Sequence, residues 1–303
     1  MTADRAIVLG APRSGTTFLM GVLDALDEAE CVTGNLFPIP MLHLAAQPLP
    51  AETEGVIERS FAGAMRDYAE SAAYRSRLAA LRKWWAASRR PSALAPALRG
   101  ERRERVLVYK EPFLAFAPQL AFDALPESRI VYLVRDGRDV ADSLLRKYDV
   151  LSDAKLAGLD SNEAPIGRRH GEIFVPWWVS AGEEEAFAAA DQFVRAAWMW
   201  REMNARCEAL LARPEVQESG RVLIVVYEEL MADPVPQGRA LIEHLGMRTT
   251  RRAERRLAEG HTRSFGIHRG REESSIRGAE QVAAPQLSRF GYWDGLAKPP
   301  RTR

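Results

Sequence analysis

A short segment near the N-terminus, Gly10 to Thr17 (GAPRSGTT), has residue types and a spacing suited to binding an anion. Its two glycines, Gly10 and Gly15, are separated by four residues. The segment follows a short apolar run, and the spacing of the apolar residues from Phe18 to Leu26 predicts a helix after it. Backbone N–H groups and a helix N-terminus in such a loop attract phosphate or sulfate. The alternative is a glycine-containing turn that holds no ligand.

The loop differs at one position from the phosphate-binding loop of proteins that use ATP or GTP. That loop carries a lysine directly after its second glycine, where the lysine reaches the β- and γ-phosphates. Here the position is occupied by Thr16, and the basic residue of the loop is Arg13. A plain ATP or GTP site is therefore disfavoured. A P-loop kinase that acts on a small molecule is kept as the alternative from another functional class.

Two further polar residues follow a second apolar run, Ile130 to Val134 (IVYLV). Arg135 comes directly after this run, and Ser143 lies eight residues later on the next predicted helix. A guanidinium fork and a hydroxyl donor together suit a phosphate group. An Arg-Asp turn before a helix is also typical of a salt-bridged helix cap. Its place downstream of the glycine loop favours the phosphate site.

Lys110 ends a third apolar run, Val106 to Tyr109, and opens the segment Lys110-Glu111-Pro112-Phe113. Ligands bind at the carboxyl ends of the strands in open α/β sheets. The chain holds only five lysines among its 42 basic residues. A lysine at this position therefore favours a functional role over that of a solvated strand end.

Together these segments resemble the sulfotransferases that use 3′-phosphoadenosine 5′-phosphosulfate (PAPS). APRSGTTFL is similar to their 5′-phosphosulfate loop, and the spacing from Arg135 to Ser143 is similar to their 3′-phosphate motif. Lysine, an acidic residue and Pro-Phe resemble the bacterial and tyrosylprotein branch. The resemblance implies transfer of a sulfuryl group from PAPS, with PAP as product, to a hydroxylated acceptor. A small molecule or natural product is favoured over peptide tyrosine.

The resemblance also implies roles for individual residues. Arg13 and Lys110 would stabilise charge during in-line transfer, and no metal is expected because these cations and the loop N–H groups replace it. Glu111 is the leading general base, with His43 and His170 behind it, although Glu111 is equally consistent with a structural partner of Lys110. The implied nucleotide-binding residues are Arg13, Ser14, Gly15, Thr16, Thr17, Arg135, Ser143, Tyr227 and Arg269. A nucleotide-binding relative that has lost catalysis is a further alternative, because the two familiar bases of the family are absent.

The elements that must position these residues form an α/β pattern. Continuous apolar runs, with another at Val222 to Val226, are typical of parallel strands covered on both faces. A helix is expected over Phe113 to Leu125. We predict a P-loop-like three-layer αβα fold with a central parallel sheet and helical insertions. Residues 1–303 are expected to form a single domain, with a helical insertion at about 36–105, an acceptor-lid insertion at about 148–191 and a C-terminal basic flap at about 260–303.

The composition narrows the choice of partners and compartment. The 42 basic and 41 acidic residues leave a net charge of +1, so no overall field attracts nucleic acid or an anionic membrane. The chain has two cysteines, Cys31 and Cys207, which we interpret as small core residues of a protein in a reducing compartment. No apolar run approaches the length of a membrane span. A cytoplasmic protein without membrane insertion is expected.

Two aromatic pairs, Trp84-Trp85 and Trp177-Trp178, lie within the expected insertions, the second together with Phe174. Such residues are most often core residues. The alternative is that they wall an acceptor pocket for an aromatic or lipid-like alcohol.

Overall fold

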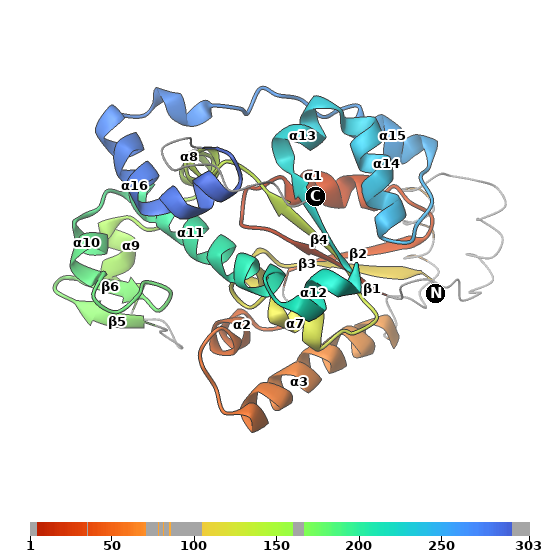
Figure 1. Ribbon diagram of the computed structural model, residues 1–303, viewed down its shortest axis with the longest axis horizontal. Coiled ribbons are helices and arrows are strands. Elements are labelled where there is room, and N and C mark those ends of the chain that lie inside the picture. The colour runs from red at the N-terminus through yellow and green to blue at the C-terminus, as the bar shows by residue number, and fades with distance from the viewer. Residues whose placement is uncertain are drawn as a thin grey trace.

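The structure, a computed structural model, shows a central sheet with helices on both sides (Figure 1). Among the residues that it describes, no helix has both the length and the apolar character that crossing a membrane requires. Trp84 and residues 293–303 of the expected flap lie outside the described residues. The structure describes residues 5–34, 36–70, 105–159 and 167–292, together with Leu78, Leu81 and Trp85.

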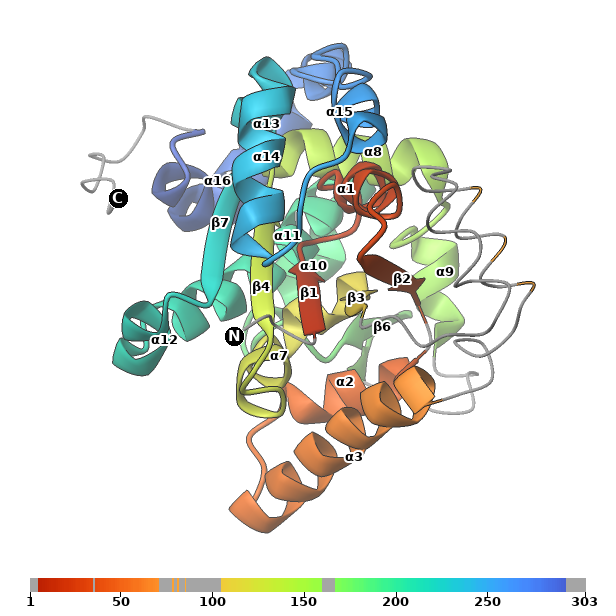
Figure 2. The same cartoon turned by 90° about the vertical axis from the view of Figure 1, so that its right-hand side faces the viewer.

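Five parallel strands form the sheet in the order β2-β3-β1-β4-β7, and Figure 2 shows them side by side. Four of them are the predicted apolar runs. The sequence does not predict β2, because this edge strand includes the half-buried Glu30, which pairs with Arg105 at 2.9 Å. The strands are β1 (Arg5–Leu9), β2 (Ala29–Thr33), β3 (Val106–Lys110), β4 (Arg129–Val134) and β7 (Val222–Val226).

Alternate residues of the central strands point into two separate hydrophobic cores. Ile7 and Leu9 of β1 belong to one core, whereas Ala6 and Val8 belong to the other. All four are almost completely buried, as expected for a parallel sheet covered on both faces. The predicted three-layer αβα arrangement is confirmed.

The helices divide between the two faces according to the core to which they contribute. The face that contains Ala6 is covered by α1 (Thr16–Leu23), α13 (Tyr227–Ala232), α14 (Pro234–His244) and α15 (Arg251–Leu257). The face that contains Ile7 is covered by α2 (Ile39–Ala45), α3 (Ala51–Glu70), η1 (Pro112–Phe116), α7 (Gln119–Asp123), α8 (Gly137–Lys147), α11 (Gln192–Leu211), α12 (Pro214–Ser219) and α16 (Glu273–Arg289). A short 3-10 turn, η3 (Ile267–Gly270), precedes α16.

The prediction of one continuous helix over Phe113 to Leu125 is wrong. The chain instead forms η1 and α7, with a break at Ala117, where φ is −132° and ψ is 56°. The cause is Pro118, whose ring disfavours the helical conformation of the preceding residue. The break keeps the first residues of this segment close to the end of β3.

The segment expected to form an acceptor lid holds two short helices and an antiparallel hairpin that the sequence does not predict. These are α9 (Asp153–Ala157), β5 (Gly167–His170), β6 (Ile173–Pro176) and α10 (Glu184–Ala189). β6 is buried throughout, and its side chains join the same core as those of α11. The segment is therefore packed against the layer that contains α8 and α11.

The carboxyl ends of all five parallel strands lie on the same side of the sheet, and β1 is the central strand. The chain passes from β1 to one side of the sheet and later returns to the other side of β1. Such a change of direction leaves a crevice at the carboxyl ends of the strands, where ligands bind in α/β proteins. The glycine loop after β1 therefore lies between the ends of β3 and β4.

We predict that Gly137→Ala destabilises the protein by about 1–3 kcal/mol, because an added Cβ would lie 2.5 Å from the Trp200 ring on α11. Gly63→Ala on α3 is the matched control. An added Cβ there meets nothing within 4 Å, so helix propensity predicts a gain of about 0.5–1 kcal/mol. Urea unfolding measures both changes. Equal midpoints for the two variants would contradict the packing of α8 on α11.

Candidate functional site

The glycine loop has a backbone conformation that restricts its residues. Gly15 is in the left-handed region (φ 94°) directly before α1, and an added Cβ would lie 2.5 Å from a ring carbon of Tyr227. Arg13 also has a positive φ of 71°, which is rare for a residue with a side chain. The Ser14 N–H closes the turn onto the Ala11 carbonyl at 3.1 Å. The predicted strand, loop and helix are therefore all present.

Two hydroxyl residues of this loop are buried. Ser14 is 1% exposed and Thr16 is 2% exposed. The Ser14 Oγ has no hydrogen-bond partner within the described part of the chain. Buried polar groups in native proteins are almost always paired, so the unpaired Ser14 hydroxyl is consistent with a ligand group at the glycine loop.

Arg13 connects the glycine loop to the second predicted motif. Its Nε donates to the Ser143 Oγ on α8 at 3.1 Å, and its carbonyl accepts from the Arg135 Nη1 at 3.2 Å. Arg135 lies at the end of β4 and is 4% exposed. The structure thus brings together Arg13, Ser143 and Arg135, which the sequence places in two motifs far apart.

Arg135 is also held by residues from the C-terminal half of the chain. Its guanidinium lies 4.8 Å from the centre of the Tyr227 ring, and its Nη2 donates to the Ser264 carbonyl at 2.6 Å. The hydroxyls of Tyr227 and Ser264 lie 3.4 Å apart. The predicted Tyr227 is therefore part of the cluster. Sequence reasoning missed Ser264, whose only signal is its place in the basic C-terminal stretch.

Lys110 ends β3 beside the glycine loop and is half-buried. Burial lowers the pKa of Lys110, the nearby Glu111 carboxylate raises it in part, and the nearby Arg13 guanidinium lowers it further. Two cations, Arg13 and Lys110, therefore lie close enough to influence each other. An anion bound between them would relieve their repulsion.

Glu111 is 4% exposed and has a structural role as well as a candidate chemical one. Its Oε1 accepts from the Phe113 N–H at 3.1 Å and so caps η1. The second oxygen, Oε2, is not used by this cap. The structural role that Glu111 has is thus the cap of η1, and not the expected direct partnership with Lys110, which Glu111 influences only through its charge. The cap leaves Oε2 available for chemistry.

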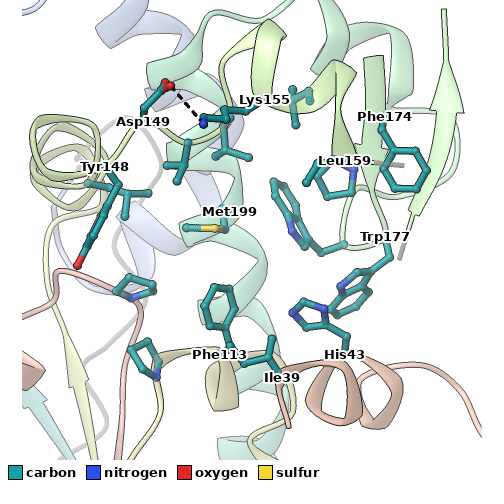
Figure 3. A pocket seen from close by; sticks show the side chains of 18 of the residues that line it. Ile39, His43, Phe113, Tyr148, Asp149, Lys155, Leu159, Phe174, Trp177 and Met199 are labelled. Atoms are coloured by element: carbon teal, nitrogen blue, oxygen red, sulfur yellow. Dashed lines mark ion pairs between the residues drawn. The ribbon is translucent and has the colours of Figure 1, made fainter. Parts of the chain in front are cut away.

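A pocket of about 930 Å³ opens beside Glu111 (Figure 3). Pro12 of the glycine loop and Pro112 border it, and Figure 3 shows Met199 of α11 near its centre with Phe113 and Trp177 on its walls. Trp178 is 6% exposed and also contacts the hydrophobic core. Trp177 and Trp178 thus line a pocket, and Trp178 is also a core residue. The pocket is lined by Pro12, Ile39, Pro40, His43, Glu111, Pro112, Phe113, Leu144, Tyr148, Asp149, Val150, Leu151, Ala154, Lys155, Leu156, Gly158, Leu159, Phe174, Pro176, Trp177, Trp178 and Met199.

The two histidines considered as alternative bases lie in different surroundings. His43 lines the pocket, and its ring centre lies 5.4 Å from that of Trp177 and 5.8 Å from that of Phe113. Burial lowers the pKa of His43 to about 4, so its ring is neutral at physiological pH. His170 is an exposed residue of β5 and does not line the pocket. The structure therefore does not bring His170 to the site.

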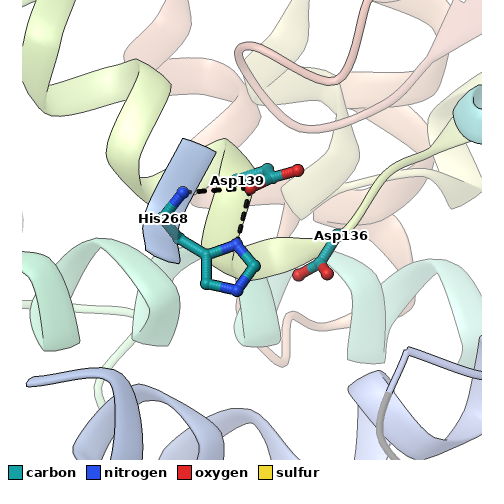
Figure 4. Close-up of side chains that lie close together, drawn as sticks. All are labelled: Asp136, Asp139 and His268. Carbon is teal, nitrogen blue, oxygen red and sulfur yellow. Dashed lines mark hydrogen bonds and ion pairs between the residues drawn. The ribbon is translucent and has the colours of Figure 1, made fainter. Parts of the chain in front are cut away.

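The segment from Gly266 to Arg271 is attached to α8 by two aspartates. Asp139 accepts a hydrogen bond from the Gly266 N–H at 2.7 Å. It also accepts one from the His268 Nδ1 at 2.6 Å, which Figure 4 shows. Asp142 accepts from the Arg271 Nε at 2.6 Å. These contacts place the predicted basic segment over α8. Arg269 itself is exposed, and no contact among the described residues joins it to Arg135 or Ser143.

Asp136, Asp139 and His268 form a cluster whose potential ligand atoms lie within 4.8 Å of one another. Both Asp136 oxygens accept hydrogen bonds from Arg138. Burial by itself would raise the pKa of Asp139, but hydrogen bonds from His268 and from the Gly266 N–H lower it below its usual value. The carboxylates are therefore engaged in holding the chain together.

The lowered pKa of His43 predicts a pH-dependent stability. Between about pH 6.5 and 4, the unfolded state binds the proton more strongly, so stability falls as the pH falls through this range. We expect His43→Gln to lose less stability than the unchanged protein between about pH 7 and 5, as measured by urea unfolding. His170→Gln is the control and should keep the original pH dependence. Identical slopes for His43→Gln and His170→Gln would contradict the burial of His43.

No curated protein matches the chain. Among solved structures, a sulfotransferase from Alicyclobacillus acidocaldarius is 17% identical, with 94% of this chain and 92% of that chain covered and a TM-score of 0.47. The sulfotransferase domain of the Synechococcus PCC 7002 olefin synthase is also 17% identical, with 92% and 94% covered and a TM-score of 0.45. A Mycobacterium avium sulfotransferase is 15% identical, with 99% and 79% covered and a TM-score of 0.45.

The family comparison gives a direct assignment. The sequence model of the sulfotransferase family matches residues 6–160, which is more than half of the 303 residues. The matched region includes the glycine loop, the Lys110 segment and the motif from Arg135 to Ser143. This confirms the resemblance seen in the sequence: the chain belongs to the sulfotransferase family.

Proposed function

We propose that the protein transfers a sulfuryl group from PAPS to a hydroxyl of an acceptor that binds in the pocket beside Glu111. One observation carries the proposal. After β1 and at the end of β3, one residue faces the pocket and the next or preceding residue carries positive charge. Pro12 and Glu111 line the pocket, whereas the adjacent Arg13 and Lys110 provide positive charge beside the glycine loop. A donor on the loop and an acceptor in the pocket would meet between these pairs.

The glycine loop is the proposed site of the 5′-phosphosulfate. The backbone N–H groups from Gly15 to Thr17 and the unpaired Ser14 hydroxyl supply donors. Arg135 and Ser143 are the proposed ligands of the 3′-phosphate, with Tyr227 packed beside them. The exposed Arg269 would complete this site only if its side chain turned toward the nucleotide.

In the proposed reaction, Glu111 Oε2 accepts the proton of the acceptor hydroxyl. The acceptor oxygen then forms a bond to sulfur while the bond between sulfur and the phosphate oxygen of PAPS breaks. Negative charge develops on that leaving oxygen, where Arg13 and Lys110 stabilise it. The products are the sulfate ester and PAP. Because Oε1 of Glu111 is fixed by the Phe113 N–H, the carboxylate would keep its orientation during the transfer.

The small-molecule kinase alternative receives no specific support. Thr16 occupies the position of the phosphate-binding lysine, and the family model that matches describes sulfotransferases. A catalytically inactive relative would bind the nucleotide but would not depend on Glu111. Sulfate transfer that is lost in Glu111→Gln separates an active enzyme from such a relative.

We predict that Glu111→Gln and Lys110→Ala each lower turnover on the order of 10²-fold or more, because one removes the base and the other removes a charge at the leaving oxygen. Sulfate transfer from PAPS to 2-naphthol, a model phenol, measures this. Gln keeps an oxygen that can cap η1, so Glu111→Gln should fold normally. The control is Glu127→Gln. Glu127 is exposed and precedes β4, at the amino ends of the strands and away from the site. Unchanged turnover in Glu111→Gln would exclude Glu111 as the base.

We also predict that Arg135→Ala weakens PAP binding by roughly 2 kcal/mol or more, since it removes a charged hydrogen-bond donor to the 3′-phosphate. Calorimetry of PAP and of 5′-AMP on the same variant separates this effect from a general distortion. The preference for PAP over 5′-AMP should fall. Arg59→Ala on the exposed side of α3 is the control. An unchanged preference in Arg135→Ala would show that another group holds the 3′-phosphate.

A further inference from the structure

The pocket beside Glu111 has an unusual charge distribution for this chain. The protein contains 42 basic residues, yet among the described residues that line the pocket only Lys155 carries a basic side chain that is charged at neutral pH. His43 also lines it, but burial lowers its pKa and leaves the ring neutral. The pocket therefore offers almost no fixed positive charge to a carboxylate, phosphate or sulfate on the acceptor.

The charges that do line the pocket lie at its two ends. Glu111 is buried at the inner end, beside the glycine loop. Lys155 and Asp149 form an ion pair at 3.8 Å, and their side chains are 58% and 69% exposed. Figure 3 shows this pair across the pocket from Phe113 and Ile39. Because both groups are in water, the pair marks the mouth of the pocket.

The wall between these ends is made mostly of hydrocarbon and aromatic side chains. Its buried polar atoms without a partner among the described residues are His43 Nε2 and Trp177 Nε1, which is too few for a molecule with many hydroxyls. Leu144 of α8, Met199 of α11 and Trp177 come from three separate parts of the chain. A sugar would bring several hydroxyls into this region, and each hydroxyl without a partner would lose its hydrogen bonds to water. The volume of about 930 Å³ lies near the upper end of the range for small-molecule sites.

From this arrangement we infer that the acceptor is a large, uncharged, hydrocarbon-rich alcohol or phenol. Its hydroxyl lies at Glu111 and its apolar body extends toward the pair formed by Asp149 and Lys155. The inference rests on the proposed sulfotransferase function and names the substrate class of that site. An acidic peptide or an anionic sugar is disfavoured as acceptor, because Lys155 is the one lining side chain among the described residues with a positive charge to meet it.

The experiment compares phenol, 4-butylphenol and 4-hexylphenol with a charged analogue of similar length, 5-(4-hydroxyphenyl)pentanoate. Binding to the full chain is measured by calorimetry with PAP present and with PAP absent. We expect affinity to rise at least tenfold from phenol to 4-hexylphenol, because each methylene buries apolar surface. The pentanoate should bind at least tenfold more weakly than 4-hexylphenol, because its carboxylate falls in the apolar region.

Variants locate the binding in this pocket. Trp177→Ala should weaken 4-hexylphenol binding at least fivefold. If Trp177→Ala does not fold, Trp177→Phe takes its place and should retain most of the affinity. Ile224→Ala, at an exposed position of β7, is the control. Affinities that do not change with alkyl length, or tighter binding of the pentanoate, would overturn the inference even if PAP binds. A lack of PAP binding would instead contradict the proposed function, and the alkylphenol series would still test the pocket.

Discussion

The two hydrogen bonds of Arg13 connect the parts of the site. A residue with a side chain costs about 1–2 kcal/mol in the left-handed conformation that Arg13 adopts. Its Nε bond to Ser143 and its carbonyl bond from Arg135 hold it there, and these bonds join the glycine loop to α8 and to the end of β4. The positions of Arg13, Ser143 and Arg135 relative to one another depend on these bonds.

The parallel sheet places the charged residues and the apolar pocket on different sides of the strand ends. Strands β1 and β3 end side by side, and at each end a cationic residue adjoins a residue of the pocket wall. Arg13 and Lys110 place positive charge on the side of the loop, while Pro12 and Glu111 border the apolar pocket. Asp139 and Asp142 attach the basic C-terminal segment to α8, which brings Ser264 against Arg135. The fold thus separates a charged compartment from an apolar one.

The sequence predicts the parts of this arrangement that depend on local pattern. The apolar runs identify β1, β3, β4 and β7, and the spacing of Gly10 and Gly15 identifies the loop between a strand and a helix. It does not predict β2, because an edge strand with Glu30 in it lacks a continuous apolar run. It also does not predict the contact of Ser264 with Arg135 or the neutral state of His43. These depend on segments that meet only after folding.

The cluster around Arg135 and the glycine loop is proposed to bind a nucleotide with a 3′-phosphate. The most direct measurement is calorimetric binding of PAP, 5′-AMP and ATP to the unchanged protein, without added metal. PAP should bind much more tightly than 5′-AMP, since only PAP carries the group that Arg135 and Ser143 are proposed to hold. Equal affinity for PAP and 5′-AMP, or a preference for ATP that requires Mg²⁺, would show that the cluster is not a 3′-phosphate site.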